Sequence, residues 1–252
     1  MTRFHMGLAV SFGLIVAVLL SVQASQGEPP TAPQLSKVIP ADELVAQAKL
    51  TLAELGPLVA GDKEFADGAE KFKKEANTLI VLALVLGKHD AEHELKAAAP
   101  AVLPAAQALA KAKNAATAKA ELAAVNAALA SRPTAASELK WEKVASLGRI
   151  MEQAESLQTE IRTGMRRFEP KAADNARLAA TLAAIGQASI YDTHEVKDPA
   201  DLPKWYQLSA GMRDAAGELS AKFKAADEAG ATAALSRLQK SCADCHEVFR
   251  SE

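Results

Sequence analysis

Apolar residues recur every three or four positions along most of the chain, which is the period of an amphipathic helix. In the second half, this pattern covers the segments 137–168, 171–190, 203–225 and 229–250. In the first half, it covers the segments 41–60, 62–87, 91–112 and 114–130. Prolines mark the clearest breaks, at Glu169-Pro170 and within 191–203. The pattern therefore predicts an all-α protein built as two tandem four-helix bundles, over 41–132 and 135–252.

The two halves are similar enough to each other to indicate a distant internal repeat. Segments 79–87 and 178–186 each begin at a leucine and end at a glycine, eight positions later. Further along, the apolar pair Leu122 and Val125 matches the spacing of Leu235 and Leu238. Alanine-rich helices also match each other by chance, so four unrelated extra helices are the alternative to a repeat.

The first residues have the pattern of a secretory signal. Arg3 provides a positive charge, residues 7–20 are apolar, and a small-x-small cleavage sequence ends at Ala24. We therefore expect a signal peptide over 1–24, a flexible lead-in over 25–40 and a periplasmic mature protein. An uncleaved N-terminal anchor is the alternative, although the apolar stretch is shorter than the roughly 20 residues of a membrane helix.

The amino-acid composition is typical of a helical protein, and the net charge argues against a nucleic-acid partner. Hydrophobic residues make up 49% of the chain and aromatic residues only 4%. Alanine and leucine, which favour helix, supply much of the difference. The formal net charge of −2 gives no basic footprint, so we expect no nucleic-acid partner.

The only two cysteines, Cys242 and Cys245, are followed at once by His246. C-x-x-C-H is the attachment signature of c-type haem, in which two thiols add to the porphyrin edge and the histidine ligates the iron. A zinc site would need four ligands, and the sequence offers no second cluster. A helical adaptor with a C-x-x-C disulfide is the alternative without haem. The sequence therefore predicts one covalent haem c near the C-terminus.

The spacing around the motif places it on the inner face of a helix. Leu235, Leu238, Cys242, Cys245 and Phe249 step by three and four residues, as core positions of a helical bundle do. The cysteines thus occupy core positions, which predicts a porphyrin lying in the bundle interior.

The first half offers no equivalent motif. In the repeat alignment, the positions that match the two cysteines are Leu129 and Arg132. We therefore expect the bundle over 41–132 to be haem-less, with a docking or homodimer-forming role.

A four-helix bundle with C-x-x-C-H near its end resembles the cytochrome c′ family, as does the continuation from His246 to Arg250, which is similar to C-x-x-C-H-x-x-[FY]-[RK]. The resemblance covers 135–252. It implies that His246 is the proximal ligand, that Phe249 packs by the haem and that Arg250 lies near the proximal imidazole. The alternative for Arg250 is a solvated charge that favours the helix dipole.

The sixth ligand of the iron separates two types within this family: one five-coordinate with a crowded distal side, the other with a methionine ligand from the first helix. Met151 lies on the first-helix stripe of the second half and is the candidate ligand. Met165 and Met212 are lesser candidates. A methionine at core spacing is ordinarily just core, which is the alternative for all three.

These patterns predict an electron-transfer protein rather than an enzyme, with a redox partner protein that the sequence does not name. A five-coordinate protein that binds nitric oxide or carbon monoxide is the alternative. A peroxidase-like enzyme ranks last because no feature places distal acid–base groups.

His89 with His93, His194 and Trp205 are further candidates for a metal-binding or haem-contacting role. His89 and His93 are four residues apart and could share a metal, but a solvated turn is the preferred interpretation because no third ligand is placed. His194 could approach the haem, with a surface role preferred. Trp205 is interpreted as core.

Overall fold

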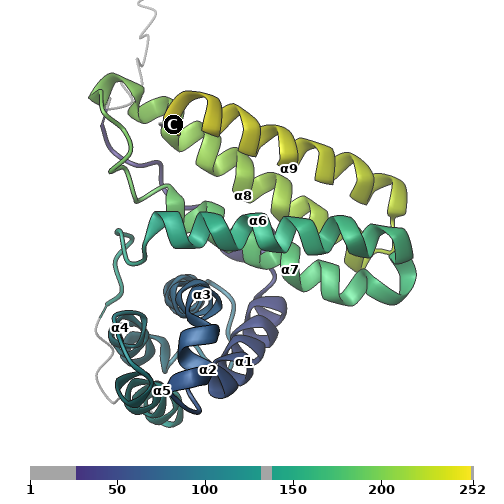
Figure 1. Cartoon of the computed structure of the whole chain (residues 1–252). Helices are drawn as coiled ribbons and strands as arrows, with labels where there is room; N and C mark the ends of the chain where they lie inside the picture. Colours follow the sequence, from purple (N-terminus) through teal and green to yellow (C-terminus); the bar gives the residue numbers. More distant parts are fainter. Residues whose placement is uncertain (1–26, 132–137, 251–252) are drawn as a thin grey trace, which may run out of the picture.

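The computed structural model describes residues 27–131 and 138–250, in which every regular element is a helix and no strand occurs (Figure 1). The α-helices are α1 (Ala41–Leu58), α2 (Asp62–Asp67), α3 (Ala69–Lys88), α4 (Ala99–Ala110), α5 (Ala115–Ala130), α6 (Leu147–Gly164), α7 (Phe168–Ser189), α8 (Leu202–Lys224) and α9 (Glu228–Phe249). Short 3-10 helices are η1 (Leu35–Lys37), η2 (Met165–Arg167) and η3 (Pro199–Asp201). The all-α prediction is confirmed. Within the described residues, no helix combines the length and apolarity needed to span a membrane, and the signal peptide predicted over 1–24 lies outside them.

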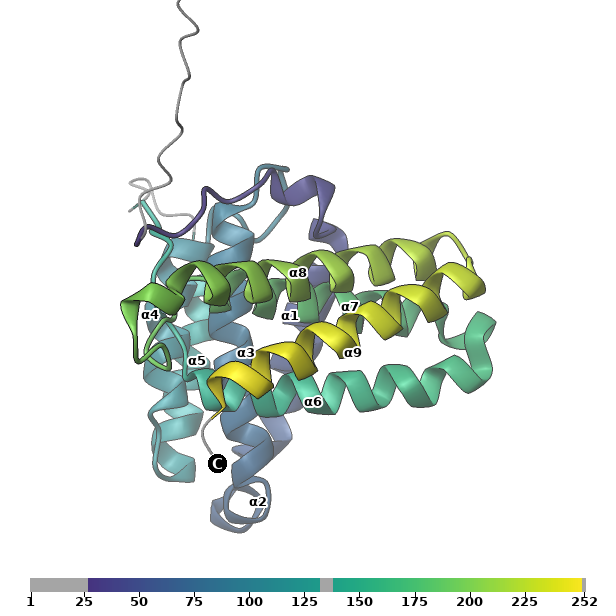
Figure 2. The same ribbon diagram turned by 90° about the horizontal axis from the view of Figure 1, so that it is seen from above.

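The helices form two groups that lie across each other. In the N-terminal group (α1–α5), α1 packs on α3, α3 on α4 and α4 on α5. In the C-terminal group (α6–α9), α6 packs on α7, α7 on α8 and α8 on α9. Figure 1 shows α6–α9 lengthwise above α3, α4 and α5, which are seen nearly end-on, and Figure 2 shows the same crossing from above.

The centre of the molecule is the pair α3 and α7. Residues 79–86 of α3 and 178–189 of α7 are all buried, on every side of the helix. A helix that is apolar all round needs neighbours on every side. Here α3 packs on α1, α4, α6 and α7, and α7 packs on α1, α3, α6 and α8.

Two glycines allow neighbouring helices to approach closely at matching places in the two groups. A Cβ atom at Gly186 in α7 would lie 2.7 Å from the backbone nitrogen of Arg213 in α8. A Cβ atom at Gly87 in α3 would lie 2.8 Å from the Cβ of Ala99 in α4. The repeat alignment matches these two glycines to each other. Gly87 allows the close approach of α3 and α4, and Gly186 allows the corresponding approach of α7 and α8.

Two helix predictions differ from the structure in the first half. The helix predicted over 62–87 is broken at Gly68, where a Cβ atom would meet the side chain of Leu58 from α1. The helix predicted over 91–112 begins only at Ala99. The loop before it is held by side-chain bonds to other segments, and Pro100 then occupies the first turn of α4, where a proline costs no hydrogen bond.

The two predictions at the ends of α6 differ as well. The helix predicted over 137–168 starts at Leu147, because the backbone before it bonds instead to side chains of the N-terminal group. Gln107 donates to the carbonyl of Val144, and Asn77 accepts from the N–H of Ser146. The break expected at Glu169-Pro170 lies earlier, at η2, and Pro170 is absorbed into the first turn of α7.

The lead-in that was predicted to be flexible is packed near its end, over 35–40, whereas residues 27–34 are exposed or half-buried. Leu35 and Ile39 are buried, at 2% and 0% exposure. The hydroxyl and the N–H of Ser36 both bond to the carboxylate of Asp90. Burial of two large apolar side chains and these bonds offset the entropy of ordering the segment, which its Pro- and Ser-rich composition does not reveal.

Candidate functional site

The C-x-x-C-H sequence lies near the end of α9. A tight turn joins α8 to α9 through Ala226, whose φ of 52° is the only positive value among described non-glycine residues. Asp227 then caps the helix by accepting from the N–H of Gly230 at 2.8 Å. The helix ends at Phe249, after which the extended Arg250 donates its N–H to the carbonyl of His246. The motif therefore has regular helical geometry.

The inner face of α9 is fully buried at first and then only partly buried at the motif. Leu235 and Leu238 are 8% and 0% exposed. Cys242, Cys245 and Phe249, which continue the same stripe, are half-buried and pack against the core cluster. The stripe is where the spacing predicts it, but the cysteines lie at the edge of the core rather than deep within it.

The wall opposite the first thiol comes from α6. The side-chain amide of Gln158 lies 3.8 Å from the sulfur of Cys242, within reach of a weak N–H to sulfur hydrogen bond. The backbone of α9 packs closely on α8, and its approach to α6 is through side chains such as this one. Gln158 is not among the residues that the sequence pattern indicates, although its position directly after the buried Leu157 places it beside the α6 stripe.

Both thiols are held in the neutral form. Burial raises the pKa of Cys242, and hydrogen bonds from Ser241 and Gln158 only partly oppose this. Burial also raises the pKa of Cys245, to about 11, with a smaller contribution from Cys242. Both cysteines are free in the structure. A reactive redox pair needs a lowered thiol pKa, so this environment disfavours thiol–disulfide exchange.

His246 lies on the exposed side of the same helical turn. Partial desolvation lowers the pKa of its imidazole, the positive charge of Arg250 lowers it further, and the carboxylate of Glu155 in α6 opposes both. A lowered pKa keeps the imidazole neutral near pH 7, which is the form that binds a metal. Arg250 is itself exposed, and its positive charge acts on the imidazole of His246 across one helical turn.

An aromatic contact fixes the end of α9. The rings of Phe249 and Trp205 meet edge to face, with centroids 5.1 Å apart. Trp205 is 3% exposed and donates its indole N–H to the carbonyl of Ser189, which confirms the prediction that it belongs to the core. The contact joins the first turn of α8 to the last turn of α9.

The register of α6 against α9 places two of the three candidate methionines, Met151 and Met165, at different levels. Because α6 and α9 run in opposite directions (Figure 1) and Gln158 meets Cys242, the residue of α6 level with His246 is Ala154. Met151 lies three residues further, about 4.5 Å along the axis. Met165 lies eleven residues the other way, about 16 Å. Met151 and Met165 are half-buried, and Met212 in α8 is buried at 7% exposure.

The histidine pair of the first half has a structural role. His89 is 2% exposed, donates from Nε2 to the carbonyl of Ile39 at 2.8 Å, and accepts at Nδ1 from Ala91. His93 bonds through Nε2 to the carbonyl of Leu86 at 3.0 Å. The preferred interpretation of a solvated turn is therefore wrong for His89, because tertiary contacts bury it. In the described part of the chain, no group of three or more His, Cys, Asp or Glu side chains is placed to hold a metal ion.

His194 lies in the loop before α8, with its side chain 45% exposed. Its two ring nitrogens face the carboxylates of Asp192, at 2.6 Å, and Glu195, at 3.1 Å. Asp192 is buried and also receives Lys143 at 3.1 Å. His194 therefore belongs to a surface cluster of charged side chains. Through Lys143 and Asp192, this cluster connects the loop to the segment before α6.

Comparison with known protein families, with characterised proteins and with solved structures finds no match to this chain. The chemistry available to it is therefore inferred from its own residues. Among the described residues, the half-buried thiols and the neutral imidazole at the end of α9 are the arrangement with the most specific chemical use.

Proposed function

We propose that this chain is an exported c-type cytochrome, carrying one covalent haem on α9 and transferring electrons in the periplasm. The observation that carries the proposal is the set Cys242, Cys245 and His246. The two thiols share the inner edge of one regular helix at a spacing of three residues, and the imidazole follows in the same turn. This is the residue set that c-type haem attachment uses.

Each of these side chains has a definite task in the proposal. Cys242 and Cys245 would hold the porphyrin by thioether bonds, and His246 would ligate the iron through a neutral imidazole. Phe249, fixed by Trp205, would pack beside the ring. Bound haem iron supplies reversible one-electron exchange, which needs no substrate site.

The surroundings of the thiols fit a large planar group. The thiols sit at an apolar edge, and the side chain that faces Cys242 from α6 is the flexible Gln158. Since α6 and α9 meet through side chains rather than by close backbone packing, we expect reorientation of these side chains to admit the group. The proposal therefore retains a four-helix haem bundle over 135–252 and a haem-less bundle over 41–132, in a chain cut after Ala24.

The environment of the thiols also separates this proposal from a disulfide or thiol-redox role. Raised pKa values at both cysteines keep the thiols protonated near pH 7. Protonated thiols exchange with disulfides slowly, because the thiolate is the nucleophile.

A second candidate function is the binding of nitric oxide or carbon monoxide at an open sixth position. The observation that favours it is the register of Met151, about one helical turn beyond the level of His246. If this methionine stays in the core, the iron would remain five-coordinate and accessible to a small diatomic ligand.

The test is expression of the whole precursor in a bacterial host that attaches c-type haem, followed by optical spectra of the purified protein. The proposal predicts a pyridine haemochrome of the c type, retained after acid–acetone extraction. A low-spin reduced spectrum unaffected by carbon monoxide would select electron transfer, and a high-spin reduced form that takes up carbon monoxide would select gas binding. Mature protein without any haem spectrum would refute both.

A further inference from the structure

The two groups of helices meet in a nearly two-fold arrangement. Helix α1 packs on α7, α3 packs on α6, and α3 packs on α7. Exchanging the first helix of each group (α1 with α6) and the second (α3 with α7) turns this set of contacts into itself. That reciprocity is the mark of an isologous interface, which two copies of one fold ordinarily make.

Individual contacts repeat the same reciprocity. At one end, the amide oxygen of Asn77 in α3 accepts from the N–H of Ser146 at the start of α6, at 2.8 Å. At the other end, the amide oxygen of Gln47 in α1 accepts from the guanidinium of Arg177 in α7. With the offset that matches Leu79 to Leu178, Ser146 corresponds to Gln47, and Arg177 corresponds to Thr78, the neighbour of Asn77.

The middle of the interface is polar and buried. Glu75 of α3, 6% exposed, accepts from Gln153 of α6 at 3.1 Å and from Thr51 of α1 at 3.3 Å. Thr51 and Gln153 are also buried, at 0% and 4% exposure. A buried polar network of this kind is favourable only when its partners stay together, because separation leaves each group unsatisfied.

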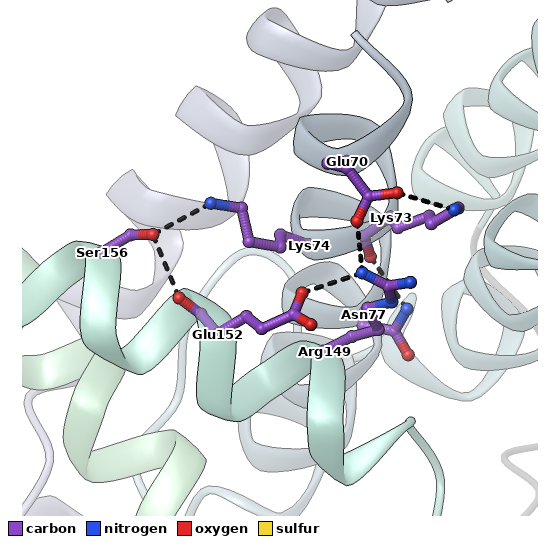
Figure 3. A network of polar contacts seen from close by, with 7 residues as sticks. All are labelled: Glu70, Lys73, Lys74, Asn77, Arg149, Glu152 and Ser156. Carbon is purple, nitrogen blue, oxygen red and sulfur yellow. Dashed lines mark hydrogen bonds and ion pairs between the residues drawn. The ribbon is translucent and has the colours of Figure 1, made fainter. Parts of the chain in front are cut away.

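The rim of the interface carries further bonds between the same two helices. Figure 3 shows Arg149 of α6 between Glu70 of α3 and Glu152 of its own helix, and Lys74 of α3 reaching Ser156 of α6. The Lys74–Ser156 bond measures 2.9 Å. Together with the buried stretches of α3 and α7, these contacts cover the α6–α7 face along 149–156 and 178–189, whereas residues 166, 167 and 169–171 at the end of this helix pair are exposed.

The polar contacts of the N-terminal face are not self-complementary. Under the same offset, Glu75 corresponds to Asp174 and Gln153 to Glu54. The contact symmetric to Glu75–Gln153 would therefore pair two carboxylates, and Asp174 instead pairs with Lys171 and Arg177 of its own helix. A copy of the N-terminal face would set Glu75 against Glu54 twice, so this face matches the other half of the chain better than it would match a copy of itself.

We propose that the N-terminal group is a permanent, built-in partner of the C-terminal group. It occupies the part of the α6–α7 face that an isologous contact with a second copy would need, and the chain is a monomer. The consequence for any partner protein is geometric: α9 lies on the side away from the N-terminal group (Figures 1 and 2), so the motif edge stays free. This inference stands whether or not a haem is attached.

The experiment uses the full chain with a protease site inserted directly after Ser131. Light scattering coupled to size exclusion gives the mass before and after cutting. The proposal predicts a monomer before cutting and an undivided particle of the same mass afterwards. Glu75→Lys in the cut chain should release the halves, whereas Glu64→Lys, an equal charge change at an exposed site in α2, should not.

Two results would overturn the proposal: a dimer before cutting, or two separate halves after cutting the otherwise unaltered chain. Both are read from a protein without any interface substitution, so they hold even if Glu75→Lys fails to fold. Halves that stay together with Glu75→Lys in a folded protein, judged by circular dichroism, would contradict the placement of Glu75 at the centre of the contact.

Discussion

The side-chain amide of Gln158 lies 3.8 Å from the sulfur of Cys242, and this contact connects the first and last helices of the C-terminal group. It sets the register between α6 and α9, and it places an adaptable polar side chain where a group bound to that sulfur would lie. This register decides which side chains of α6 can reach a group bound to α9, and the buried side chains of α9 and α3 contribute to the stability of the fold.

Removal of both thiols should abolish covalent haem attachment. Cys242→Ala with Cys245→Ala leaves His246 without any thioether support, so haem that binds at all should be extractable by acid–acetone. The measurement is haem-dependent peroxidase staining of denatured protein on a gel, compared with Ser241→Ala, which leaves the motif intact in the same turn of α9. Staining of the double variant equal to that of the unaltered protein would contradict thioether attachment.

Met151→Leu separates the two coordination types. The substitution keeps the volume of the half-buried side chain, so it should cost less than about 1.5 kcal/mol in free energy of unfolding. If Met151 ligates the iron, the variant should lose the long-wavelength methionine–iron band of the oxidised protein and gain carbon monoxide binding. Met165→Leu is the control, since Met165 lies in η2, beyond the end of α6 and about 16 Å from the level of His246. A band that survives Met151→Leu shows that this methionine is not the ligand.

Leu238→Ala should destabilise the protein strongly. Leu238 is 0% exposed and lies one turn before Cys242, where α9 enters the core. Removing a fully buried leucine side chain costs about 2–5 kcal/mol, because apolar contacts are lost and a cavity remains. Val248, 50% exposed on the same helix, is the control, and Val248→Ala should change the free energy of unfolding by less than about 0.5 kcal/mol. Urea denaturation followed by circular dichroism measures both, and equal effects would contradict the burial of this face.

Glu75→Gln should remove a pH dependence of stability. Burial raises the pKa of Glu75 in the folded protein, the nearby Glu54 adds to this, and Gln153, Lys71 and Thr51 partly oppose it. A carboxyl group with a raised folded pKa contributes stability below its unfolded pKa, and that contribution is lost as pH rises through the folded pKa.

The glutamine variant should therefore be more stable than the unaltered protein near pH 7 and similar to it at acid pH. Urea titrations across this range measure the difference, with the exposed Glu64→Gln as the control. A stability difference between Glu75→Gln and the unaltered protein that does not change with pH would contradict the raised pKa.

The sequence pattern predicts α8 and α9 well because each has one strong apolar stripe and clear ends. The structure starts α9 at Glu228 and ends it at Phe249, each within one residue of the predicted bounds. The C-x-x-C-H motif and its place on that stripe are likewise readable from spacing alone.

Other features depend on contacts between distant segments, which no local pattern contains. A loop that includes His89 replaces the start of the helix predicted over 91–112. The imidazole of His89 bonds to the carbonyl of Ile39, fifty residues earlier, and this contact holds the loop in place. The broken helix at Gly68 depends on the approach of Leu58. The unbroken apolar run over 79–86 did contain a signal, since a helix apolar on all sides must be covered on all sides, which is how α3 lies against the C-terminal group.

The most direct test of the haem assignment is the intact mass of the mature protein, made in a host that attaches c-type haem and measured under denaturing conditions. The account predicts a chain beginning at Ser25 whose mass exceeds that of the polypeptide by one haem, with a fragment spectrum that places the addition on Cys242 and Cys245. A mature chain with the bare polypeptide mass and two alkylatable thiols would contradict it.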